Sequence, residues 1–495
     1  MKAITVETMQ NLEYKAINEY GIPSIVLMEN AACGFVSALK NNFGDLKGRK
    51  VLVVCGKGNN AGDGYAISRL LHFGGAKVFV LPVFDTELLT SDAKTNADVA
   101  KNMGVTFIKD LGDEYDIIID AIFGTGFRGE VKTPVKEIIQ KINQSNAYIA
   151  SVDVPSGVSL SGDTDDCFIL CDLCVTFGYA KLYQFTGAAQ GSFKKLIVAP
   201  ISIPEPEEFS YLITKDTFSL LPKREPISHK GTFGKVLAYI GSYGMAGAAI
   251  LSGGAILKSG AGMATIAAPD DIIPTIAHEF PSVMTYPVGE DTIQGLPEKA
   301  QGMDSVLIGC GLGTKDITRS AVAALIDCNK PTVIDADGLN ILSENIDLIN
   351  GKNVVLTPHI AEFSRLCGVG VDNIKKNPVG HLKDFCTHYG VCVVLKDAVT
   401  IICDKNGHLA ICNAPNSGMA TAGSGDVLAG IITSMLAQGL STFDAAAAGV
   451  YVHSAAGAMA KEKLGEAGMT SADILSFVPK AFMSPVDITP HIKEL

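Results

Sequence analysis

The segment VLVVCGKGNNAGDGYAISRLL, residues 51–71, decides the fold of the first half of this chain. In it an apolar run is followed by a glycine-rich loop and then by a helical pattern. Gly56, Gly58 and Ala61 have the G-x-G-x-x-A spacing of dinucleotide-binding turns, where backbone N–H groups approach a phosphate. An ordinary NAD site also has an acidic residue at the tip of the second strand. The second predicted strand, AKVFVLPV at 76–83, has none, so the loop is typical of an anion site but not of a dehydrogenase.

Length and composition indicate more than one α/β domain. A chain of 495 residues exceeds one typical domain, so two or three are expected. The 47% hydrophobic residues can fill large cores, and the 51 glycines suit many tight turns. The net charge of −12 argues against a nucleic-acid partner, because phosphate backbones need clustered Lys and Arg.

Two segments indicate whether the chain is secreted or crosses a membrane. Residues 1–15 carry acids and amides where a signal peptide would have an apolar core, so secretion is not expected. Residues 236–257 have no charge and are long enough to span a bilayer, but glycines, Ser242 and Tyr243 interrupt them. This pattern favours a strand, a glycine loop and a buried helix. We therefore expect a cytoplasmic protein without membrane contact.

The twelve cysteines are scattered through apolar segments, as in a reduced cytosolic protein. Cys167, Cys171 and Cys174 have a spacing that could also hold an iron–sulfur cluster. Cys171 and Cys174 lie an odd number of residues apart in a predicted strand, so their side chains would face opposite sides. Core cysteines are therefore the favoured interpretation.

Short apolar runs alternate with helical patterns over the first 200 residues, which predicts a Rossmann-like, doubly wound parallel sheet with helices on both faces. The predicted strands cover 51–55, 76–83, 115–123, 147–154 and 173–178. The predicted helices cover 62–73, 92–103 and 134–143. In such a sheet, ligands bind at the carboxyl ends of the strands.

A proline-rich stretch, APISIPEPEEFSYL at 199–212, predicts a linker between two domains. We place the first domain at 1–207 and the second at 208–495. The second domain has its own α/β series, with predicted strands at 235–241, 305–313, 331–337, 353–358, 391–397 and 400–404.

Polar residues follow four strands of the first domain, where the strand ends should meet in one crevice. Asn60, Asp120 and Ser156 offer oxygens suited to a hard cation, and Asp153 could act as a general acid or base. Each residue alone also fits a structural role, since Asp153 can cap a turn and Lys181 can be a solvated surface charge. Four polar strand ends together favour a site.

The motifs GNNAGDG, DAIFGTGFRGE, SVDVPSG and TFGYAK resemble the signature of the NAD(P)H-hydrate epimerase family over nearly all of residues 1–205. The resemblance implies a hydrated dinucleotide as substrate, with a potassium ion held by Asn60, Asp120 and Ser156. We expect proton transfer by Asp153, with Lys181. The implied substrate contacts are Asn59, Asn60, Ala61, Gly62, Asp63, Gly124, Thr125, Gly126, Phe127, Arg128, Gly129, Glu130 and Asp153.

The second domain carries NSGMATAGSGDVLAG, residues 416–430, with a helix predicted to begin near Asp426. Backbone amides at such a helix start stabilise phosphate charge, and an aspartate beside them can take a proton from an attacking hydroxyl. This arrangement resembles the ribokinase-like superfamily. A helix-capping aspartate after a flexible turn is the structural alternative.

Further motifs resemble the NAD(P)H-hydrate dehydratase family over residues 228–430, in the family's order: SHKGTFGKVLAYIGS, GMAGAAILSGGAILKSGAGMATIAAP, GCGLGT, DADGLN, LTPHIAEFSRL and VLKDAVTII. By resemblance, the substrate contacts are Ala248, Gly311, Gly313, His359 and Asp426, with Asp426 facing the reacting hydroxyl. The implied nucleotide contacts are Lys396, Asp397, Ala398, Val399, Thr400, Gly423, Ser424 and Gly425. Ala422 and Ser424 depart from the expected glycine and threonine, but both are small.

The two resemblances together imply an isomerase fused to a lyase that repairs hydrated NADH and NADPH. The first domain would interconvert the R and S hydrates, and the second would phosphorylate and dehydrate the S form. The fused form resembles prokaryotic members that use ADP, and phosphoryl transfer implies Mg²⁺. A homo-oligomer is expected. A small-molecule kinase fused to a dinucleotide-binding domain and a non-catalytic nucleotide sensor are the alternatives.

Overall fold

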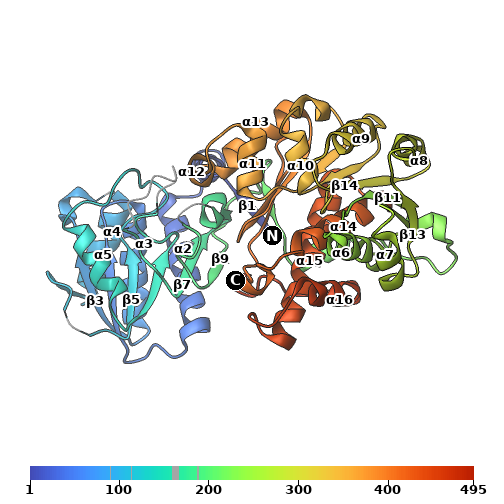
Figure 1. The fold of residues 1–495 in the computed structure, drawn as a ribbon. Helices are drawn as coiled ribbons and strands as arrows, with labels where there is room; N and C mark the ends of the chain where they lie inside the picture. The colour runs from blue at the N-terminus through green and yellow to red at the C-terminus, as the bar shows by residue number, and fades with distance from the viewer. Residues whose placement is uncertain (90, 113, 159–166, 187–188) are drawn as a thin grey trace. The chain divides into compact units, whose positions relative to one another are not determined.

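The computed structural model describes residues 1–495 except 90, 113, 159–166 and 187–188. It divides into two compact units (Figure 1). The N-terminal unit comprises Lys2–Ser210 and Pro490–Leu495, and the C-terminal unit comprises Met1 and Tyr211–Thr489. Each unit has its own hydrophobic core, because the two clusters of buried apolar residues share no member.

The N-terminal unit is built on an eight-stranded parallel sheet. In spatial order its strands are β20 (Ile492–Glu494), β9 (Leu196–Ala199), β7 (Leu173–Phe177), β6 (Tyr148–Val152), β5 (Ile117–Ala121), β2 (Lys50–Cys55), β3 (Lys77–Pro82) and β4 (Thr106–Phe107). The central strands are buried along nearly their whole length, as parallel strands covered on both faces must be. The predicted α/β sheet is confirmed.

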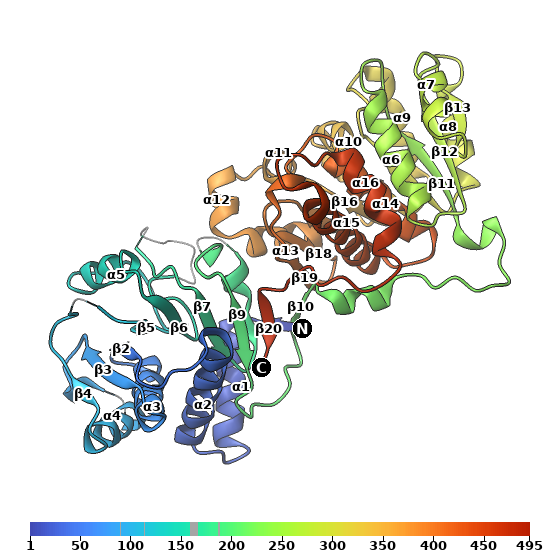
Figure 2. The ribbon, with the colours of Figure 1, turned by 90° about the horizontal axis from the view of Figure 1, so that it is seen from below.

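Five helices of the N-terminal unit belong to its described part: α1 (Val6–Asn18), α2 (Ser24–Phe43), α3 (Asn59–Phe73), α4 (Ser91–Asn102) and α5 (Val135–Asn143). The last three confirm the predicted helices. The first two were not predicted. Helix α2 contacts α3, β7 and β9, so it covers one face of the sheet (Figure 2). Helix α1 follows β1 (Lys2–Ile4), which pairs in parallel with β8 (Ala180–Lys181).

The strands of the C-terminal unit continue from parallel to antiparallel pairing. In spatial order they are β13 (Met284–Pro287), β12 (Met263–Ala268), β11 (Lys235–Tyr239), β14 (Ser305–Ile308), β15 (Thr332–Ile334), β16 (Val354–Leu356), β17 (Cys392–Leu395), β18 (Thr400–Cys403), β19 (Leu409–Cys412) and β10 (Ser210–Leu212). The predicted strands are confirmed, while β10, β12, β13 and β19 were not predicted. Strand β10 lies in the stretch that was predicted as a linker.

The helices of the C-terminal unit are α6 (Ala246–Lys258), α7 (Ile273–Glu279), α8 (Leu296–Gln301), α9 (Asp316–Asp327), α10 (Asp337–Leu342), α11 (Ile360–Cys367), α12 (Val371–Lys376), α13 (Pro378–Tyr389), α14 (Ser424–Ala437), α15 (Thr442–Leu464) and α16 (Ser471–Ala481). Helix α14 packs against α6, α15 and α16. Residues 236–257 form most of β11, a loop and most of α6, as predicted.

The compact units differ from the predicted division at 207/208 in three places: Met1 belongs to the C-terminal unit, and residues 208–210 and 490–495 belong to the N-terminal unit. Residues 490–495 belong to the N-terminal unit, because Ile492 of β20 pairs in parallel with Leu196 of β9.

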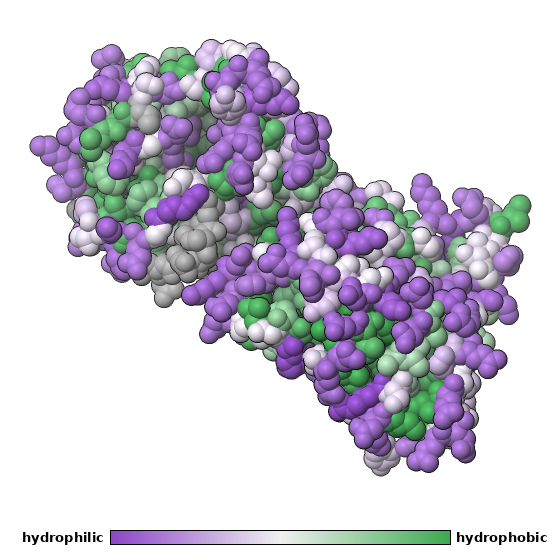
Figure 3. Space-filling view, turned by 90° about the horizontal axis from the view of Figure 1, so that it is seen from above, coloured by the Kyte–Doolittle hydropathy of each residue, from purple (hydrophilic) through white to green (hydrophobic). Residues whose placement is uncertain are grey.

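Polar and charged side chains cover most of the face seen in Figure 3. Among the described residues, no helix combines the length and apolarity needed to cross a bilayer.

Candidate active sites

The N-terminal unit encloses a cavity of about 650 Å³ beside the carboxyl ends of β2, β5 and β6. The asparagine loop, the GTG loop and the ends of two later strands meet in it, as the sequence predicts. Of the predicted residues, those that line it are Asn59, Asn60, Asp63, Gly124, Thr125, Gly126, Phe127, Arg128, Asp153 and Lys181. Helices α1, α2 and α4 supply further walls that were not predicted.

Asp153 and Lys181 form a buried ion pair in this cavity. Lys181 Nζ lies 2.6 Å from Asp153 Oδ1, and it also donates to Thr176 Oγ1 at 2.7 Å and to Phe177 O at 2.9 Å. Lys181 is 1% exposed, so the alternative of a solvated surface charge is wrong. Asp153 has a φ of 63°, a conformation that costs energy in a non-glycine residue and occurs often at functional sites.

Two more carboxyl groups reach the same cavity. Burial raises the pKa of Asp63 well above its ordinary value, and the charges of Asp153 and Glu13 raise it further, while Lys181 lowers it. Burial also raises the pKa of Glu13, with a smaller contribution from Asp153. The cavity thus combines one ion pair with two carboxyl groups whose pKa values are raised by burial.

The three predicted potassium ligands are joined by one hydrogen-bond network. Ser156 donates from Oγ to Asp120 at 2.5 Å and from its backbone N–H at 2.8 Å. Phe123 links this pair to Asn60, because its N–H donates to Ser156 Oγ and its carbonyl accepts from Asn60 Nδ2. Asn60 Oδ1 is buried and has no hydrogen-bond partner among the described residues. Burial raises the pKa of Asp120, and its hydrogen bonds from Ser156 lower it.

Four predicted substrate residues lie outside the cavity lining. Ala61 is fully buried, and Gly62 packs closely on Met28 and Ala93, so that a Cβ added there would displace the end of the Met28 side chain. Gly129 and Glu130 follow the GTG loop without reaching the lining described here. Their roles in binding stay predictions.

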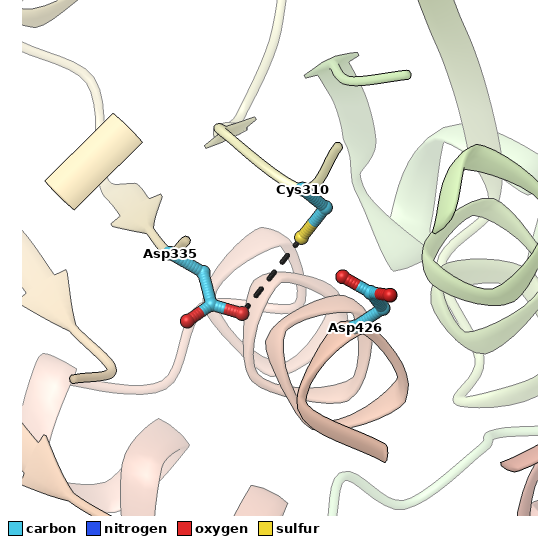
Figure 4. A group of neighbouring side chains, drawn as sticks. All are labelled: Cys310, Asp335 and Asp426. Carbon is cyan, nitrogen blue, oxygen red and sulfur yellow. Dashed lines mark hydrogen bonds between the residues drawn. The ribbon is translucent and has the colours of Figure 1, made fainter. Parts of the chain in front are cut away.

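In the C-terminal unit, the predicted phosphate loop forms the start of α14. Gly423 precedes the helix with a left-handed φ of 86°, and Asp426 lies in the first helical turn. The side chains of Asp426, Asp335 and Cys310 converge, with their ligand atoms within 4.8 Å of one another (Figure 4). Burial raises the pKa of Asp426 to about 6, and the charge of Asp335 adds to this effect. A carboxyl group with a pKa near neutral pH is suited to act as a general base.

A partly buried lysine forms an ion pair with the second aspartate of this group. Lys396 Nζ lies 2.8 Å from Asp335 Oδ1. Burial lowers the pKa of Lys396, but the charge and hydrogen bond of Asp335 outweigh it, so the net shift is upward. A Cβ added to Gly425 would lie 3.1 Å from Lys396 Nζ, so the glycine lets the lysine approach the start of α14.

The remaining predicted residues of this unit lie in four places. Ala248 and Gly311 pack together, since a Cβ on Gly311 would lie 2.8 Å from the Ala248 Cβ. His359 caps α11 through its Nδ1, and its side chain is half exposed. Its backbone forms an isolated parallel β-bridge with Lys396. Gly313 donates its N–H to Asp337 at 2.8 Å. Asp397, Ala398, Val399 and Thr400 form the turn into β18, and their nucleotide contacts stay predictions.

Ser424, one of the two departures from the expected motif, has a buried partner. Its Oγ lies 3.2 Å from His453 Nε2 on α15. Burial lowers the pKa of His453 to about 4, so the ring is neutral at physiological pH. The serine hydroxyl at the start of α14 is therefore held by an uncharged imidazole.

Both halves of the chain match models of known families. The model described as YjeF-related protein N-terminus matches residues 24–183, and the one described as NAD(P)H-hydrate dehydratase matches residues 236–480. The bifunctional NAD(P)H-hydrate repair enzyme Nnr of Moorella thermoacetica is 36% identical over 97% of this chain and 96% of its own length. The Coxiella burnetii enzyme is 35% identical over 94% and 96%, respectively.

This chain belongs to the bifunctional NAD(P)H-hydrate repair enzyme family. A solved ribokinase-like superfamily protein from Enterococcus faecalis is 26% identical, with a TM-score of 0.50, and covers 56% of this chain and 98% of its own. That similarity supports the ribokinase-like fold predicted for the C-terminal half of this repair-family chain.

Sequence reasoning missed four side chains of the two repair-family sites. Asp335 is part of the quoted motif DADGLN, and Cys310 is part of GCGLGT. Both could have been found from their position in the last half of a predicted strand. Glu13 and His453 had no such signal, because α1 and α15 bring them to their sites from distant parts of the chain. Cys167, Cys171 and Cys174 are all buried, as side chains of the apolar core would be.

Proposed function

We propose that this chain repairs hydrated NADH and NADPH, with R/S epimerisation in the N-terminal unit and nucleotide-driven dehydration in the C-terminal unit. The observation that carries the proposal is the presence, in one repair-family chain, of two separate acid–base centres at the carboxyl ends of α/β sheets. One is the Asp153–Lys181 pair in the cavity, and the other is Asp426 at the start of α14.

In the N-terminal unit, the asparagine and GTG loops would bind the dinucleotide, and Asp153 would move protons at C6 of the ring. Lys181 would orient the Asp153 carboxyl group and place a positive charge beside it through the 2.6 Å contact. The Asp153 contacts from Lys181, Thr176 and Phe177 all fall on Oδ1 within the described part of the chain, which leaves Oδ2 to act on substrate.

Potassium fits the network behind the GTG loop. Asn60 Oδ1 is a buried acceptor without a partner among the described residues, and the Asp120 carboxylate and the Ser156 oxygen are hard donors of the kind that such a cation prefers. These three residues would hold the ion, and its charge would offset that of buried Asp120 and steady the loop that contacts the substrate. The catalytic proton transfers would remain with the side chains of the cavity.

In the C-terminal unit, Asp426 would take the proton of the C6 hydroxyl as that oxygen attacks the terminal phosphorus of ADP. Backbone amides from Gly423 to Gly425 and the Lys396 ammonium would stabilise the charge of the phosphates. Loss of phosphate then restores the dihydronicotinamide, because phosphate is a far better leaving group than hydroxide. Mg²⁺ would offset phosphate charge; the carboxylates of Asp335 and Asp426 suit it, whereas the Cys310 thiol does not.

The first experiment supplies mixed R and S hydrates of NADH to the purified protein with Mg²⁺ and K⁺. The near-ultraviolet absorbance of the restored dihydronicotinamide is followed with ADP in one cuvette and ATP in another. We expect full recovery with ADP, because the dehydration step alone would stop at the S fraction. No recovery with either nucleotide would contradict the proposal and favour the kinase alternative. Light scattering of the same preparation tests the proposed homo-oligomer.

A further inference from the structure

Helix α1 forms a wall of the epimerase cavity that the matched family region, residues 24–183, does not include. Strand β1 pairs in parallel with β8, so that Ile4 lies in register with Lys181. Helix α1 begins two residues after Ile4. This pairing carries Glu13 into the cavity that Asp153 and Lys181 also line.

The ionisable groups around Glu13 come from three other elements: Asp63 on α3, Asp153 after β6, and Lys181 on β8. The three ammonium hydrogens of Lys181 are used by Asp153, Thr176 and Phe177, so Asp153 is its one carboxylate partner among the described residues. In that same part of the chain, Glu13 has neither a hydrogen bond nor an ion pair. One cation therefore faces three carboxyl groups, and burial raises the pKa of Glu13 above its ordinary value.

We propose that Glu13 is a second catalytic acid of the epimerase site and protonates the oxygen that leaves C6 of the hydrated ring. The proposal rests on the function proposed above. C6 carries the hydroxyl and is bonded to ring N1, so the N1 lone pair can form an N1–C6 double bond as the C6–oxygen bond breaks. The proton of Glu13 turns the departing oxygen into water.

Asp153 completes the reaction from a different wall of the cavity. Water adds to the opposite face of C6 and gives its proton to Asp153, while the electron pair of the double bond returns to N1. One proton is given and one is taken, and nothing is oxidised or reduced. In the reverse direction the protonated Asp153 is the acid and the Glu13 carboxylate is the base. Two carboxyl groups that line one cavity from different elements can supply the acid and the base that such a reaction needs.

The test uses the full chain with the Glu13→Gln substitution, K⁺, Mg²⁺ and ADP, and it follows the R and S hydrates separately. We expect R-hydrate conversion to fall about 100-fold or more, as general acid loss does, with little change in KM. Repair of the S hydrate should be unchanged. Glu7→Gln, on the exposed side of the same helix, is the matched control and should leave both rates unchanged.

The pH profile separates catalysis from a structural role. The wild-type epimerisation rate should fall as pH rises through the raised pKa of Glu13, and Glu13→Gln should lack this alkaline decline. Glu13→Asp should recover part of the rate together with the decline. The proposal would be overturned if Glu13→Gln kept the wild-type epimerisation rate and pH profile. It would also be overturned if Asp63→Asn lost the alkaline decline while Glu13→Gln kept it. If the wild type repairs neither hydrate, the proposed function itself fails, which is a different result from failure of Glu13→Gln alone.

Discussion

At the scale of single residues, the buried imidazole of His453 makes a testable contribution to stability. Burial lowers its pKa to about 4, against an unfolded value near 6.5, so the unfolded chain binds more protons between these pH values. The neutral ring therefore contributes stability above pH 6.5 that is lost as pH falls toward 4. Between pH 7 and pH 5 the loss from this group should be roughly 2 kcal/mol.

Urea unfolding of the wild type and His453→Gln at both pH values measures this contribution. The variant should lose less stability on acidification by that amount, whereas exposed His278→Gln should follow the wild-type dependence. Parallel pH curves for wild type and His453→Gln would show that the ring is not held neutral by the fold. The same comparison reports on the start of α14, since His453 contacts Ser424 at 3.2 Å.

At the scale of elements, the close packing of α6 and α14 positions Asp426, and it depends on glycine. A Cβ on Gly430 would lie 2.4 Å from the Ser252 carbonyl oxygen and 2.8 Å from the Ala255 Cβ, both on α6. Gly430→Ala should lower the free energy of unfolding by roughly 1–3 kcal/mol, because the backbone of one helix must shift. Gly247→Ala in α6 meets nothing within 4 Å and should leave stability unchanged or raise it by up to about 1 kcal/mol. Urea unfolding of both variants measures these changes in the free energy of unfolding. If Gly430→Ala were as stable as Gly247→Ala, the two helices could shift apart at no cost.

Elements are also the scale at which sequence reasoning succeeded and failed. The parallel strands could be predicted because burial on both faces makes each an apolar run, as in β2 and β5. The start of α14 could be predicted because its glycines and Asp426 follow one another in the sequence. The place of β20 could not, since one buried residue, Ile492, in a polar tail gives no signal for pairing with β9. Glu13 was missed for the same reason, because the pairing of β1 with β8 joins distant segments.

At the scale of the whole molecule, two compact units with separate cores imply two centres that can be inactivated one at a time. Asp426→Asn should abolish recovery of the dihydronicotinamide but leave R/S interconversion intact. Asp153→Asn should still repair the S hydrate, while the R hydrate disappears only at its spontaneous rate. Normal repair by Asp426→Asn, or equal consumption of both epimers by Asp153→Asn, would contradict the role of the residue concerned.

Mixing the two variants tests whether the centres work together only through the substrate. The S hydrate made by the intact N-terminal unit of Asp426→Asn can diffuse to the intact C-terminal unit of Asp153→Asn. Full recovery of a mixed R and S sample, at a rate that rises with the concentration of both variants, is therefore expected. Recovery that stops at the S fraction, despite interconversion by Asp426→Asn alone, would mean that the hydrate must pass between units of one chain. Wild-type chains at the same total concentration set the reference rate for this comparison.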